Sequence, residues 1–213
     1  VRDVAGGQSR SSRGAGRSPR GWKEKVLRIL AEIQAPLAPL LLRLSHWALL
    51  KFLSRLFLSV QLHRGQLKMV LQAAGTPSLP LVFLSVHRSQ LDGLLLSFLL
   101  FSQGLGVPRV TMSGRPYSPL LRAFLSRLGG IFLPAKPPSA WDEELSGAVL
   151  ATYVREVLRS RQPLLIFLEE PQVTLQLSAA AQQWLAPVYE AVRDGTIPDV
   201  LLVPVGIGYD VVP

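Results

Sequence analysis

Short apolar runs alternate with longer amphipathic segments along the second part of the chain. The short runs are apolar almost without interruption, which is typical of strands buried on both faces of a parallel sheet. The longer segments carry apolar residues at the spacing of a helix. This alternation predicts an α/β fold with a mostly parallel sheet covered by helices. We expect strands at residues 80–86, 109–113, 130–133, 163–169 and 199–207, and helices at 90–103, 117–128, 142–161 and 178–194.

A helical segment is expected before the sheet. Residues 22–34 carry apolar side chains at three- and four-residue spacing, which predicts one apolar helix face, and Pro36 ends that helix. The segment 40–60 is more hydrophobic, but Arg43 and Lys51 are among the charges that leave no apolar run of about 18 residues. A simple transmembrane span is therefore not expected. Two alternatives remain, a helix lying in a membrane interface, which we favour, and a plain buried helix.

Charge is concentrated at the start of the chain. Residues 1–28 hold eight Arg or Lys against Asp3 and Glu24, so this segment supplies +6 of the net charge of +9. We expect it to meet an acidic surface, either nucleic acid or anionic lipid headgroups, or to be a solvated basic linker. We expect three parts. Residues 1–20 form a basic disordered segment, residues 21–75 form a helical segment, and residues 76–213 form an α/β domain that is incomplete at its C-terminus.

Composition excludes several kinds of functional site. The chain contains no cysteine, so no disulfide framework, thiolate nucleophile or zinc-thiolate site is expected. The acidic run 142–144 is typical of a first helical turn rather than of a metal site. Because the chain begins at Val1 and stops at Pro213 directly after an apolar run, we expect a fragment of a longer protein.

The candidate chemistry lies in "LVFLSVHRSQLDGLLLSFLL", residues 81–100. His87 follows the first expected strand, and ligands of open α/β sheets bind at the carboxyl ends of strands. Ser89 and Asp92 match a helix capping pattern, which is the structural interpretation of the carboxylate. Across the strand-to-helix corner His87 can also meet Asp92. A carboxylate on one ring nitrogen fixes the tautomer and leaves the other nitrogen to take a proton from an alcohol.

Three downstream blocks join this one in a recognisable order. After the block at residues 87–92 come "GGIF" at 129–132, "IFLEE" at 166–170 and "LLVPVGIGYD" at 201–210. In order and spacing these four blocks resemble those of the glycerolipid acyltransferases, over roughly residues 80–213. The chain is most similar to the mitochondrial branch of glycerol-3-phosphate acyltransferase, and within that branch to its divergent second isoform.

The resemblance implies a reaction. His87, oriented by Asp92, deprotonates the sn-1 hydroxyl of glycerol 3-phosphate, which attacks the thioester of acyl-CoA and gives lysophosphatidate. Acyl-CoA is then a co-substrate, and no metal or other cofactor is expected. The resemblance also implies a membrane surface as a partner and the mitochondrial outer membrane as the location.

The blocks that bind phosphate in the family are altered. Its second block continues Phe-Ile-Arg-Arg, whereas this chain has "FLPA" at 132–135 and then Lys136. Its third block is Phe-Leu-Glu-Gly-Thr-Arg, and "FLEEPQ" at 167–172 keeps Glu169 but places a neutral Gln172 where a cation is usual. These changes add negative charge and remove positive charge at the expected phosphate site. Both effects are unfavourable for binding a phosphate dianion.

Other residues are therefore candidates for substrate binding: Arg115, Lys136, Glu169 and Gly206. For Arg115 and Arg122 we favour the alternative explanation, that they are solvated surface cations. Two alternatives to the leading function stay open. One is a degenerate member of the family that acts as a membrane scaffold for protein or RNA through residues 1–28. The other is an acyltransferase with a different acceptor.

Overall fold

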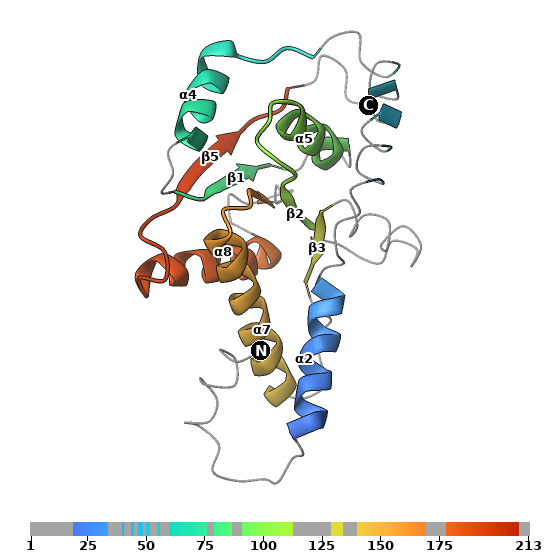
Figure 1. Ribbon diagram of the computed structural model, residues 1–213, viewed down its shortest axis with the longest axis vertical. Coiled ribbons are helices and arrows are strands. Elements are labelled where there is room, and N and C mark those ends of the chain that lie inside the picture. The colour runs from blue at the N-terminus through green and yellow to red at the C-terminus, as the bar shows by residue number, and fades with distance from the viewer. Residues whose placement is uncertain are drawn as a thin grey trace.

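A five-stranded sheet forms the centre of the molecule (Figure 1). Its strand order is β3-β2-β4-β1-β5, and every pairing between neighbouring strands is parallel, as predicted. The strands are β1 (Leu81–Ser85), β2 (Arg109–Met112), β3 (Gly130–Phe132), β4 (Leu164–Phe167) and β5 (Leu201–Val205). The computed structural model describes residues 19–33, 40, 44, 47–48, 50–51, 55, 60–75, 79–86, 91–112, 129–133, 140–168 and 178–208.

The helices match the amphipathic segments. The structure has α2 (Pro19–Ile33), α4 (Arg64–Gly75), α5 (Leu91–Ser102), α7 (Ala140–Arg159) and α8 (Ala179–Arg193). The expected helix at 117–128 lies outside the described residues, as does most of the expected basic segment, residues 1–18. Of the helices described, none is both long enough and apolar enough to cross a bilayer.

The two faces of the sheet carry different helices. Leu96 and Leu100 of α5 pack with Phe83 and Leu165 on one face. On the other face α2, α7 and α8 pack against the sheet through a larger cluster that includes Val82. Right-handed crossovers explain this division, because the chain moves one way along the sheet from β1 to β2 and the opposite way from β3 through β4 to β5.

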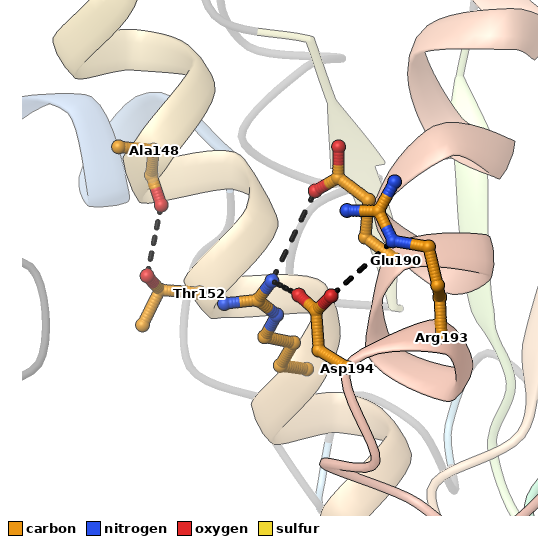
Figure 2. A network of polar contacts seen from close by, with 6 residues as sticks. Ala148, Thr152, Glu190, Arg193 and Asp194 are labelled. Atoms are coloured by element: carbon orange, nitrogen blue, oxygen red, sulfur yellow. Dashed lines mark hydrogen bonds and ion pairs between the residues drawn. The ribbon is translucent and has the colours of Figure 1, made fainter. Parts of the chain in front are cut away.

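A surface network fixes α8 against α7 (Figure 2). The Arg155 Nη2 lies 3.0 Å from Asp194 Oδ2 and 3.9 Å from Glu190 Oε2. Asp194 also accepts a hydrogen bond of 3.3 Å from the Nε of Arg193. These groups are partly exposed, so each pair stabilises the fold by only about 0–1 kcal/mol. The larger contribution to the α7–α8 contact is apolar and includes the buried Trp184.

Strand β5 departs from the prediction. We expected strands covered on both faces, but exposure alternates along β5, and 49 % of Leu202 is exposed. The reason is its place at the edge of the sheet, where it pairs with β1 alone among the described strands. Pro204, the least strand-like residue of the run, is tolerated there because an edge strand does not need every backbone N–H.

Candidate active site

Topology marks one place where a ligand can bind. Strands β1 and β4 are neighbours, but α5 follows β1 on one face of the sheet and α8 follows β4 on the other. Where crossovers leave adjacent strands on opposite faces, the carboxyl ends of those strands border a crevice that binds ligands in open α/β sheets. The candidate site is therefore at the carboxyl ends of β1 and β4.

The strands that lead into three of the four sequence blocks end there. Ser85, the last residue of β1, is in register with Phe167 of β4 and Val205 of β5. The backbone N–H of Leu168 donates a 2.8 Å hydrogen bond to the Ser85 carbonyl, which extends this alignment past β4. Gly206 comes next along the chain after β5. The strands thus end at one level, directly before the segments that carry the predicted chemistry.

Two of those predicted residues follow the aligned ends in the sequence. His87 comes two positions after Ser85, and Glu169 comes two positions after Phe167. Both lie outside the described residues, so their roles stay predictions.

Asp92 is positioned by the start of α5. The helix has Asp92 in its first turn, while Ser89, the expected cap, lies outside the described residues. The Asp92 side chain is 0 % exposed, and it is the only fully buried carboxylate in the described part of the chain. A helix N-terminus favours a negative charge even when exposed, so capping does not require burial. A hydrogen bond to a buried carboxylate is stronger than one in water, which suits Asp92 to orient a neighbouring base.

The first turn of α5 lies close to the sheet. A Cβ atom at Gly93 would stand 3.4 Å from Phe167 Cε2 and 3.8 Å from Val110 Cγ1. This contact brings the turn that carries Asp92 over the carboxyl end of β4. Sequence reasoning gave Gly93 no role, because a glycine after a capping carboxylate is not a distinctive pattern.

Thr111 is a second residue that sequence reasoning missed. The backbone N–H of Phe167 donates a 3.2 Å hydrogen bond to Thr111 Oγ1, and both residues are buried. The β2–β4 pairing ends at Val110 and Leu165, so the Thr111 hydroxyl accepts the hydrogen bond that a carbonyl of β2 would accept in a longer ladder. This bond supports the end of β4 directly before Leu168. The only available signal was a lone hydroxyl residue in an apolar strand.

The second block does not join the others. Strand β3, which holds "GGIF", is the far edge of the sheet and is separated from β1 by β2 and β4. Three inter-strand spacings amount to about 14 Å. The expected substrate-binding residues beyond β2 and β3, Arg115 and Lys136, lie outside the described residues, and so does Arg122.

Arg109 is a buried cation at the opposite end of the sheet. It begins β2, is 7 % exposed and donates from Nε to Gln162 Oε1 at 2.9 Å. Burial raises the pKa of the nearby Tyr153 to about 12, and the Arg109 guanidinium opposes that rise. Because Arg109 is at the amino end of its strand, about 10 Å from the carboxyl end, it does not replace a phosphate-binding arginine of the crevice.

Comparison with known proteins gives consistent matches. The family model described as Acyltransferase matches residues 57–207. Glycerol-3-phosphate acyltransferase 2, mitochondrial, of Mus musculus is 52 % identical over 218 residues, which cover 100 % of this chain and 27 % of that protein. Its Homo sapiens counterpart is 50 % identical with the same coverage. Glycerol-3-phosphate acyltransferase 1, mitochondrial, of Sus scrofa is 38 % identical over 192 residues, which cover 88 % of this chain and 23 % of that protein. The chain spans about a quarter of the length of the curated relatives it matches.

Proposed function

The chain belongs to the acyltransferase family, and from this membership we propose that its protein transfers an acyl group from acyl-CoA to the sn-1 hydroxyl of glycerol 3-phosphate. The product is lysophosphatidate, an early intermediate of phospholipid synthesis. The observation that carries the proposal is the buried carboxylate of Asp92 at the β1–β4 crevice, beside the strand end that leads to His87. Similarity to proteins named glycerol-3-phosphate acyltransferase supports this acceptor. It does not favour the scaffold alternative.

The proposed reaction needs one acid–base pair. The Asp92 carboxylate accepts a hydrogen bond from one ring nitrogen of His87 and fixes the tautomer. The other ring nitrogen takes the proton of the sn-1 hydroxyl as its oxygen attacks the thioester carbonyl. The tetrahedral intermediate then collapses, the carbon–sulfur bond breaks, and the imidazolium returns the proton to the leaving CoA thiolate. The acyl group passes directly to the acceptor without a covalent acyl-enzyme.

The substrate-binding residues are part of the same proposal. A Cβ atom at Gly206 would meet nothing within 4 Å among the described residues, so packing among those residues does not require a glycine. An open backbone at the end of β5 is suited to close approach by a ligand. Glu169 follows β4 at the crevice, whereas Arg115 and Lys136 are proposed to provide positive charge for the phosphate.

The test is acyl transfer by the full-length protein in membranes. We expect labelled acyl-CoA and glycerol 3-phosphate to give 1-acyl-glycerol 3-phosphate and free CoA in equal amounts. Lysophosphatidate and a neutral long-chain alcohol serve as competing acceptors. Preferential acylation of either competitor would contradict the proposed acceptor, and the absence of transfer to all three would contradict the enzymatic function.

We also propose that residues 40–55 face a membrane interface, in a mitochondrial membrane and specifically the outer one. The described apolar side chains there are exposed, with Leu40 81 %, Leu44 69 % and Trp47 64 % accessible. The Lys51 ammonium lies 5.4 Å from the centroid of the Trp47 ring. Apolar side chains beside cations are typical of interfacial helices on anionic lipid. This exposure supports the interfacial alternative over a buried helix.

Vesicle flotation tests the membrane proposal. We expect Trp47→Ala to weaken binding of the full chain to vesicles of phosphatidylcholine with anionic cardiolipin, because it removes an exposed aromatic anchor. Tyr189→Ala is the matched control, since Tyr189 is 66 % exposed on α8. An equal loss of vesicle binding in the two variants, or unchanged vesicle binding by Trp47→Ala, would contradict the proposal. An RNA or protein partner for residues 1–28 stays a prediction.

A further inference from the structure

Ser85 carries a buried hydroxyl that the fold does not use. The residue is 1 % exposed, and its Oγ has no hydrogen-bond partner in the described structure. Three other buried polar atoms share this property, on Arg109, Arg155 and Trp184, but none of them lies at the carboxyl end of the sheet. An unpaired buried hydroxyl costs free energy of folding that an alanine would avoid. Folding alone therefore does not explain a serine at the end of β1.

The Ser85 side chain faces the side of the sheet that holds α5. Side chains alternate along a strand, so Ser85 shares a face with Phe83, which packs in the α5-side cluster. Its neighbours across the sheet are Phe167 and Val205, both apolar and both part of that cluster. The hydroxyl thus has apolar side chains on both flanks.

The helix on this side of the sheet, α5, carries the buried carboxylate of Asp92 in its first turn. The turn that carries Asp92 lies over Phe167, because a Cβ atom at the adjacent Gly93 would be 3.4 Å from the Phe167 ring. Phe167 is the direct cross-strand neighbour of Ser85. Phe167 is thus the cross-strand neighbour of the buried Ser85 hydroxyl, and the residue next to the buried Asp92 contacts its ring from α5.

We propose that Ser85 is a positioning residue for the acid–base pair. When substrates fill the crevice, the Ser85 hydroxyl donates a hydrogen bond to the Asp92 carboxylate and fixes the orientation of that carboxylate. A carboxylate has lone pairs for both donors. Hydrogen bonds of active sites are often unmade without substrate and form in the reacting complex. This inference rests on the proposed acyltransferase function.

Three substitutions test the role of the hydroxyl in the full-length protein. Ser85→Ala removes it, Ser85→Cys keeps the size but offers only a weak donor, and Ser85→Thr retains it. We expect the first two to lower kcat about ten- to a hundredfold with unchanged KM values, and Ser85→Thr to keep most of the activity. The melting temperature of Ser85→Ala should equal or exceed that of the wild type, because an orphan hydroxyl is removed. Ser146→Ala is the control, since Ser146 is buried in α7.

Combination with Asp92→Asn distinguishes positioning from general damage. A hydroxyl that acts through the carboxylate has nothing to position once the carboxylate is gone, so Ser85→Ala should not slow Asp92→Asn further. Two results would overturn this inference but not the proposed function. One is a loss of kcat in the double variant equal to the product of the two single losses, and the other is full activity of both Ser85→Ala and Ser85→Cys. An inactive wild type would overturn the proposed function and this inference together.

Discussion

Asp92→Asn is expected to lower kcat for acyl transfer by about 10³–10⁴-fold while the protein stays folded. Asparagine has nearly the same shape as aspartate, so the buried space under α5 stays filled. It carries no charge, however, and cannot stabilise the imidazolium that the proposed mechanism forms at His87 when the sn-1 hydroxyl of the acceptor loses its proton. Its amide nitrogen is also a donor, which favours the wrong imidazole tautomer. The loss should therefore appear in the chemical step.

Single-turnover acyl transfer measures that step, and Asp194→Asn provides the matched control. Asp194 is the carboxylate that follows α8 and pairs with Arg155, with 41 % of its side chain exposed. Its substitution should leave kcat unchanged and cost at most about 1 kcal/mol of unfolding free energy. A kcat for Asp92→Asn within tenfold of the wild type would mean that the buried carboxylate serves only the start of α5.

Gly129→Ala is expected to destabilise the fold by about 2–4 kcal/mol. Gly129 has a φ of +107°, and a Cβ atom there would lie 2.7 Å from the carbonyl oxygen of Pro108. That oxygen cannot yield easily, because the next residue, Arg109, is tied through its backbone N–H to the Pro163 carbonyl at 2.7 Å. The Gly129 carbonyl itself accepts from the Val110 N–H at 3.0 Å. The first glycine of "GGIF" is thus required by the backbone.

Gly147→Ala is the control for that substitution. Gly147 is exposed within α7, and a Cβ atom there would meet nothing within 4 Å. Alanine is a better helix former than glycine, so this change should stabilise the fold by about 0.5–1 kcal/mol. Chemical denaturation of the two variants compares them directly. A Gly129→Ala protein as stable as the wild type would contradict the described turn before β3.

Local pattern was sufficient for the elements and for the family. The strand predicted at 80–86 corresponds to β1 at Leu81–Ser85, and the helix predicted at 142–161 corresponds to α7 at Ala140–Arg159. These elements are set by near-neighbour periodicity, which the sequence displays directly. The resemblance to the mitochondrial acyltransferase branch is confirmed, with higher identity to its second isoform than to its first.

Strand order was not predictable in the same way. Strand β4 lies between β1 and β2, although it comes later in the chain than both. Such an insertion is decided by crossover handedness and by packing between distant segments, neither of which leaves a local pattern. The sequence blocks therefore suggested one site, whereas the sheet places the block of β3 at the far edge from β1 and β5.

The candidate site was predictable in part. Asp92 was found from its spacing to His87, but its complete burial was not evident. Ser85 and Thr111 were missed because a single hydroxyl in an apolar strand has no distinctive pattern, and the bond of Thr111 joins residues 56 positions apart. His87 lies outside the described residues and stays a prediction.

The central claim is that His87 and Asp92 act as one unit, and a double-mutant cycle in the full-length protein tests it most directly. The measurement is the single-turnover rate of acyl transfer to glycerol 3-phosphate by the wild type, His87→Ala, Asp92→Asn and the double variant. Residues that act as a unit have strongly non-additive effects. We predict that the double variant is no slower than His87→Ala. A double variant whose loss is the product of the two single losses, or a His87→Ala protein with wild-type activity, would contradict the account.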